Sequence, residues 1–209
     1  MKEKQAHGRL FLRYRDHGDL EAFGQLLEEF EGPLYAYMMR FLRNPSEAED
    51  ALQEVWLKAI RRAESYHDRG QFSSWIYRIA HNHCLDLIRR NGRVVALDTE
   101  TEQSQPGCWP SASEEMARSP FENLEERELV EYLEKAVATL SPAMREVFVL
   151  RTSADLSFRE ISEVLECPIG TVLGRMHLAV QKIRKQFEEM GLAPPDGENA
   201  ATSAIENAS

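Results

Sequence analysis

Charged and amide side chains line one side of a predicted helix from Phe72 to Arg90. Apolar residues in this stretch, FSSWIYRIAHNHCLDLIRR, recur every three or four positions and therefore share one buried face. A helix with aromatic residues at its start and arginine and asparagine on one side can stack on bases and contact phosphates. The same pattern also fits an amphipathic helix with a solvated polar face. The predicted exposed residues are Arg78, Asn82, Asp86, Arg89 and Arg90, and the predicted buried ones are Trp75, Ile76, Ile79, Ala80, His83 and Leu87.

Two histidines and a cysteine of the same helix, His81, His83 and Cys84, could suggest metal chemistry. On a helix the two histidines point about 200° apart, so they cannot chelate one ion from one face. The chain has no HExxH, P-loop or nucleophile-elbow motif, and its three cysteines form no CxxC pair. The sequence therefore predicts a protein that is not an enzyme, has no small-molecule substrate and uses neither a metal ion nor another cofactor.

Composition and charge narrow the class of protein further. No apolar run approaches the roughly 20 residues of a membrane span, and residues 1–15 are too charged and polar for a signal peptide. We therefore expect a cytoplasmic protein without membrane insertion. Three cysteines kept as reduced thiols are consistent with that compartment. The net charge of −10 argues against a nucleic-acid binder only when it is averaged over the chain. Residues 92–140 hold 4 basic against 11 acidic side chains, whereas residues 169–187 hold 4 basic and none acidic.

The elements that must position these residues are all predicted to be helical. Asp19 is a good N-cap for a first helix, and Gly32-Pro33 is expected to end that helix and start another. Ser46 and Glu49 form a capping box for a third helix. A turn-rich loop from Tyr66 to Gln71, YHDRGQ, then leads into the Phe72 helix, with Gly70 as its expected hinge.

The third helix carries an exposed leucine, Leu57, framed by carboxylates and an amide. Asp50, Gln53 and Glu54 lie on the same side of the helix. Such a group hints at a protein-docking surface, although a single apolar residue on a solvated face is also ordinary.

The second half predicts a linker followed by a helix-turn-helix. From about Arg93 to Ser119 the chain is rich in Ser, Glu, Thr and Pro without periodicity, which is typical of a flexible linker. After further helices, Ser157 and Glu160 form a capping box for a short helix, and Thr171 is expected to cap a long one after a tight turn. The predicted fold is all-α, with two small helical domains. The first domain is predicted at residues 1–91 and the helix-turn-helix domain at residues 121–190. Residues 92–120 form the predicted linker and residues 191–209 a predicted disordered tail.

Three of these stretches together resemble an extracytoplasmic-function (ECF) sigma factor of bacterial RNA polymerase, a branch of the sigma-70 family. They are NPSEAEDALQEVWLKAI, FSSWIYRIAHNHCLDLIRR and LSFREISEVLECPIGTVLGRMHLAVQKIRKQF, in the order that the family has them. The resemblance covers roughly residues 19–91 and 121–187, and it implies promoter recognition and help in melting the minus-ten element.

The resemblance also implies partners and site residues. It assigns core polymerase docking on the β′ clamp coiled coil to Asp50, Gln53, Glu54 and Leu57, and it implies further contact with the β flap, promoter DNA and an anti-sigma factor. The YHDRGQ loop corresponds to the loop that receives a flipped-out base. The implied minus-ten residues are Asp68, Arg69, Gln71, Trp75, Arg78, Asn82, Arg89 and Arg90, and the implied minus-thirty-five residues are Arg159, Thr171, Gly174, Arg175, His177, Gln181 and Lys182.

The chain departs from the family pattern along the last helix. Leu173, Gly174, Leu178 and Val180 stand at positions that are often polar or basic in the family. Glu166 stands where the turn commonly has glycine, and a left-handed backbone there costs about 1 to 2 kcal/mol. We therefore expect an atypical or weak preference for the minus-thirty-five element.

Two non-catalytic alternatives remain open at this point. A stand-alone helix-turn-helix regulator would bind duplex DNA without polymerase and usually as a dimer. An adaptor would bind polymerase but not the promoter, and only the acidic total charge favours it.

Overall fold

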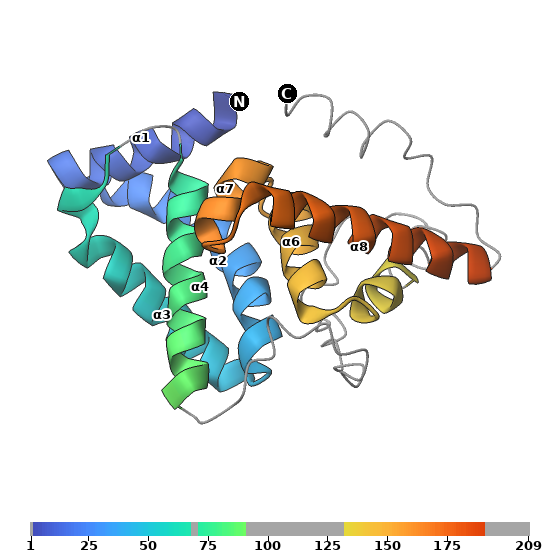
Figure 1. Ribbon diagram of the computed structural model, residues 1–209. Helices are drawn as coiled ribbons and strands as arrows, with labels where there is room; N and C mark the ends of the chain where they lie inside the picture. Colours follow the sequence, from blue (N-terminus) through green and yellow to red (C-terminus); the bar gives the residue numbers. More distant parts are fainter. Residues whose placement is uncertain (1, 68–70, 91–131, 191–209) are drawn as a thin grey trace, which may run out of the picture. The chain divides into compact units, whose positions relative to one another are not determined.

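The computed structural model describes residues 2–67, 71–90 and 132–190, and the regular elements in these ranges are helices (Figure 1). The all-α prediction is confirmed. Residues 132–138 are also helical and lie within the predicted helix-turn-helix domain 121–190. The predicted linker, the tail, Asp68 and Arg69 lie outside the described residues. The elements are α1 Lys2–His17, α2 Leu20–Leu42, α3 Pro45–Arg61, the 3₁₀ turn η1 Ala63–Ser65, α4 Phe72–Arg90, α6 Pro142–Thr152, α7 Phe158–Val164 and α8 Ile169–Glu189.

The chain divides into two compact units. One comprises residues 1–96 with 149–172, and the other comprises residues 97–148 with 173–209. No helix of the described ranges is long and apolar enough to cross a membrane.

Helix α4 is the scaffold of the first unit, where it packs against α1, α2, α3 and α7 (Figure 1). Its bounds are those predicted from the sequence. Eleven of its 19 residues are buried, among them Ile76, Tyr77 and Cys84, because apolar positions repeat through five turns. The side of α4 left to solvent is therefore narrow and entirely polar in its middle, at Arg78, Asn82 and Asp86.

Helix α2 runs through Pro33, so the predicted break at Gly32-Pro33 is wrong. Proline removes one backbone hydrogen bond, but the apolar stripe continues across it through Phe30, Leu34 and Tyr37, which are all buried. Burial of this continuous face outweighs the local cost. The predicted cap is confirmed, since the Asp19 carboxylate accepts from the Ala22 amide at 3.0 Å.

Helix α3 begins two residues earlier than the predicted capping box allows, so Ser46 is not its N-cap. Its N-cap is Asn44, whose side-chain oxygen accepts from the amides of Ser46 and Glu47, and Pro45 occupies the first turn. Asparagine is as good a cap as serine, and proline is favoured directly after a cap. Ser46 is thus inside the helix rather than at its start.

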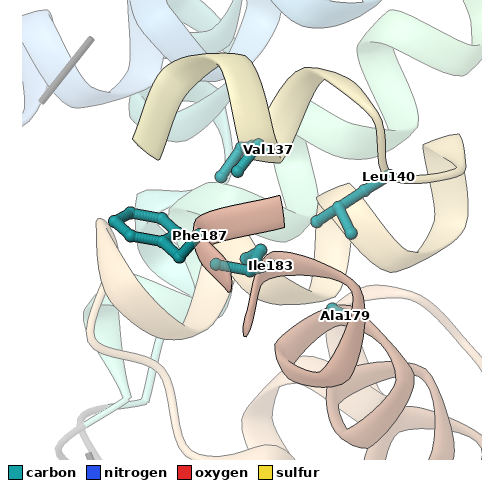
Figure 2. Packing of buried hydrophobic residues seen from close by; sticks show 6 residues of the cluster. Val137, Leu140, Ala179, Ile183 and Phe187 are labelled. Atoms are coloured by element: carbon teal, nitrogen blue, oxygen red, sulfur yellow. The ribbon is translucent and has the colours of Figure 1, made fainter. Parts of the chain in front are cut away.

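The second unit has its own apolar core. Figure 2 shows side chains of α8 converging on the segment that precedes α6. This cluster comprises Ala136, Val137, Leu140, Ala179, Ile183 and Phe187. Tyr132, Met144 and Phe148 pack against it. The apolar stripe of α8 therefore anchors its inner face and leaves its outer face to solvent.

The short helix, turn and long helix follow one another along the chain as predicted. Both halves of the capping box at the start of α7 are present, between Ser157 and Glu160. Glu166 in the turn has a left-handed backbone with φ 51°. This conformation usually requires glycine, so Glu166 holds it at the cost considered above. Helix α8 begins at Ile169, so the predicted cap at Thr171 is wrong: the Pro168 carbonyl already accepts the amides of Thr171 and Val172, which places Thr171 inside the helix.

Candidate nucleic-acid interface

The predicted exposed face of α4 is confirmed. Arg78, Asn82, Asp86, Arg89 and Arg90 are all exposed. Arg89 lies 3.7 Å from Asp86 one turn earlier, an exposed pair that contributes little to stability. Arg78 lies 2.9 Å from the Glu166 carboxylate, also an exposed pair. Three guanidinium groups and one amide thus face two carboxylates, and this surplus of donors suits a phosphate backbone.

An aromatic cluster supports the start of α4. Trp75 is half-buried, and its ring centroid lies 4.9 Å from that of Tyr66, 5.2 Å from that of Phe11 and 5.8 Å from that of Phe72. Three neighbouring rings hold the indole in place while part of it stays exposed, which is the arrangement of a stacking platform.

The loop before α4 is tied to this cluster from both ends. On one side, Arg15 of α1 donates a hydrogen bond to the Tyr66 carbonyl at 2.7 Å. On the other, the half-buried Gln71 accepts hydrogen bonds at its carbonyl from the Trp75 amide and the Ser74 hydroxyl, both at 3.0 Å. Helix α1, which the sequence analysis did not predict, supplies both Arg15 and the fully buried Phe11.

Two buried histidine pairs fix α4 against its neighbours. Tyr37 of α2 lies 3.1 Å from His81, and Lys58 of α3 lies 2.6 Å from His83. Burial and the nearby Lys58 ammonium lower the pKa of His83, so the neutral ring accepts a hydrogen bond from the Lys58 ammonium at Nδ1. Sequence spacing did not reveal these contacts because each joins two different helices. Within the described ranges, no three His, Cys, Asp or Glu residues are placed to hold a metal ion.

The predicted docking residues share the outer side of α3. Asp50, Gln53 and Leu57 are exposed, and the Leu57 exposed fraction is 43%. Glu54 is half-exposed and lies 3.9 Å from Arg61. Leu57 is thus an apolar contact point surrounded by polar groups, which is the composition of a small protein interface.

The residues predicted for duplex recognition lie on α7 and α8. Arg159 is exposed on α7, 3.7 Å from Glu163. Arg175 is half-buried, whereas the remaining five of the predicted set are exposed on α8. The Gln181 amide nitrogen lies 2.9 Å from Nε2 of His177 one turn earlier. The exposed five are Thr171, Gly174, His177, Gln181 and Lys182.

Comparison with known proteins identifies the family. The family model of sigma-70 region 2 matches residues 26–94, and that of sigma-70 region 4 matches residues 130–183. The ECF RNA polymerase sigma factor SigW of Bacillus subtilis is 31% identical over 173 residues, which cover 83% of this chain and 92% of that protein. The RNA polymerase sigma-H factor of Pseudomonas aeruginosa is 28% identical over 174 residues, covering 83% and 90% of the two chains.

Two solved structures share the fold. CnrH, in complex with the cytosolic domain of CnrY, matches with a TM-score of 0.56 and 21% identity over 88% of this chain and 98% of that one. RpoE of Bartonella quintana, in complex with the anti-sigma factor NepR, matches with a TM-score of 0.55 and 21% identity. That match covers 79% of this chain and 96% of RpoE. Helices α3 and α4 lie in the region 2 match and α7 in the region 4 match, which excludes a stand-alone regulator. This chain belongs to the ECF sigma factors, the non-enzymatic subunits that direct core RNA polymerase to promoters.

Proposed function

We propose that the chain uses α4 to capture the melted non-template strand of the minus-ten element and α8 to hold the upstream duplex. The narrow polar face of α4, next to the supported Trp75 ring, is the observation that carries this assignment. A flipped base costs a few kcal/mol to extrude, which stacking and edge hydrogen bonds can offset. Trp75 supplies the stacking surface and Asn82 an edge contact, while Arg78, Arg89 and Arg90 follow the phosphates. Asp68, Arg69 and Gln71 belong to the pocket for the flipped base.

The outer side of α3 is the proposed docking surface for the β′ clamp coiled coil. Leu57 would be buried on binding, and Asp50, Gln53 and Glu54 would form the polar rim. The helix-turn-helix domain would contact the β flap, with Arg159 and the exposed residues of α8 on the minus-thirty-five duplex.

The proposed domain borders are 1–91 for the region 2 domain, 92–120 for the linker, 121–190 for the region 4 domain and 191–209 for the tail. The two compact units divide α6 and α8 between them. We base the borders on the family matches instead, because an unbroken helix is one structural element.

An anti-sigma factor is the proposed regulator, and the cytoplasm is the proposed location. RpoE of Bartonella quintana, which shares the fold, was solved in complex with the anti-sigma factor NepR. Such a partner would act by covering surfaces that polymerase or promoter DNA needs.

Substitution of Trp75 and Asn82 by alanine tests the α4 assignment. In reconstituted holoenzyme, we expect the double variant to bind core polymerase as the original chain does but to lose promoter opening, read by permanganate reactivity of unpaired thymines. Because Trp75 packs in an aromatic cluster, the exposed Asn82→Ala variant is tested alone as well. Unchanged opening in both variants would refute the assignment.

A further inference from the structure

The outer face of α8 is neutral in its first half. Gly170, Thr171, Gly174 and Leu178 are exposed there, and the Leu178 exposed fraction is 42%. Arg175 lies at the margin of this face and is half-buried. The exposed basic residues come only in the second half, at Lys182, Arg184 and Lys185.

Neither packing nor backbone geometry explains the two glycines of this face. A Cβ added at Gly170 or Gly174 would meet no atom of the described structure within 4 Å, and neither residue has a positive φ. Glycine inside a helix costs about 1 kcal/mol relative to alanine. Gly24 of α2 is equally open, so open space alone marks no site. Gly170 and Gly174 differ because they share an exposed face with Leu178, and glycine there allows another molecule to approach the backbone closely.

The charge of α8 identifies the occupant of this face as nucleic acid. Residues 169–187 contain four basic side chains and no acidic one, in a chain whose net charge is −10. The acidic residues of α8, Glu188 and Glu189, come only at its end, where Glu189 lies 3.7 Å from Lys185. Lys182 is exposed two turns beyond Gly174, where it can contact a phosphate while the first half of the helix faces the base edges. A protein partner would not require this separation of cationic and apolar halves.

Arginine paired with guanine is the commonest specific base contact, but the centre of this face has no arginine. It offers Leu178, one turn after Gly174, and apolar side chains recognise the methyl group of thymine. The Gln181 amide engages His177 with one N–H, which leaves its other N–H and its carbonyl oxygen for an adenine edge.

We propose that α8 reads thymine-containing A·T pairs in the minus-thirty-five duplex by close backbone approach at Gly170 and Gly174 and by contact between Leu178 and thymine methyl groups. This inference rests on the proposed function, in which α8 holds that duplex. It names the bases that the helix selects and the residues that select them.

Selection by reconstituted holoenzyme from templates with a randomised upstream element gives the first test. We expect enrichment of thymine in the minus-thirty-five element. Replacement of the enriched thymines by deoxyuridine removes only the methyl group, and it should lower initiation roughly fourfold, as expected for one buried carbon. A Leu178→Ala variant should be indifferent to that replacement.

The glycines are tested against a matched control. Gly174→Ala and Gly24→Ala each add one methyl group to a helix interior where nothing lies within 4 Å. Both should raise the unfolding midpoint, because alanine is the better helix former. Only Gly174→Ala should lower initiation from the selected promoters, by roughly fivefold or more, the size of one mismatched base pair.

The outcomes separate the two proposals. No initiation on any template, with core polymerase that is active with another sigma factor, would overturn the proposed function and this inference together. Initiation from promoters with guanine-rich or unselected minus-thirty-five elements would overturn only the inference. Thymine enrichment with loss of the deoxyuridine effect in Leu178→Ala would establish it.

Discussion

Helices α4 and α8 carry the two proposed DNA surfaces, but they are built into the molecule differently. Eleven of the 19 residues of α4 are buried, and a buried contact from Tyr37 and a half-buried contact from Lys58 hold it to α2 and α3. Only four of the 21 residues of α8 are buried. A helix embedded among four neighbours, as α4 is, leaves few positions that can change without loss of packing. A helix held by one stripe can change most of its surface, and α8 is where we expect the chain to depart from the family pattern.

The largest expected difference between the two helices concerns the state of the DNA that each binds. Alanine at both Trp75 and Asn82 should lower initiation from duplex promoters by roughly a hundredfold, the combined size of two base contacts. A template melted in advance at the minus-ten element should restore most of that loss. Gly174→Ala should show no such rescue, because α8 binds duplex. Gln25→Ala, an exposed amide on α2, serves as the control. Equal loss on both templates would contradict a role of α4 in opening.

Substitutions in the docking surface on α3 should lower initiation from all promoters equally, whereas substitutions in α8 should depend on the minus-thirty-five sequence. Leu57→Asp should weaken core polymerase binding by about tenfold or more, as for a buried interface residue. Leu20→Asp makes the same change at a more exposed leucine, with an exposed fraction of 74%, and should leave binding unchanged. Binding by fluorescence anisotropy with labelled chain measures both. A Leu57→Asp chain that bound core normally would remove α3 from the docking surface.

The capping box at the start of α7 should matter for stability alone. Ser157→Ala removes the hydroxyl that accepts from the Glu160 amide and donates to its carboxylate, at an expected cost of about 1 kcal/mol. Ser162→Ala, later in the same helix, should be neutral or slightly stabilising. Urea unfolding of both variants checks this, and equal midpoints for the two would show that the cap contributes nothing.

The smallest expected effect is a pH dependence of the free energy of unfolding that arises from His83 of α4. Burial and Lys58 lower the pKa of His83, so the unfolded chain binds this proton more readily than the folded one. The contribution of neutral His83 to the free energy of unfolding is therefore complete above about pH 6.5, the ordinary pKa of histidine. It is lost as the pH falls through the lowered pKa of the folded state. Histidine resonances followed by NMR measure this directly. A His83 midpoint at or above 6.5 would contradict the buried, lysine-paired geometry.

The sequence predicted the elements whose signals are local. The bounds of α4 followed from an unbroken apolar repeat, and the caps at Asp19 and Ser157 followed from side chains that reach their own helix. Pro33 misled the prediction because its local cost is smaller than the burial of the continuous apolar face of α2.

The contacts that join separate helices could not be predicted in this way. Phe11 of α1 is the fully buried partner of Trp75, yet beyond Leu10 and Leu12 its segment is mostly charged and polar. The pairing of Lys58 with His83 needs the crossing of α3 and α4, which no spacing within either helix encodes. For the candidate site, spacing placed the exposed residues on the correct faces of α3, α4 and α8. Their roles came from the resemblance to a family.

Transcription by holoenzyme reconstituted from purified bacterial core polymerase and this chain, on templates with both promoter elements randomised, tests the central claim most directly. We predict initiation that depends on the chain, a defined minus-ten sequence among the transcribed templates, and loss of that sequence preference in the Asn82→Ala variant. Transcription with no selected minus-ten sequence, or none above core polymerase alone, would contradict the account.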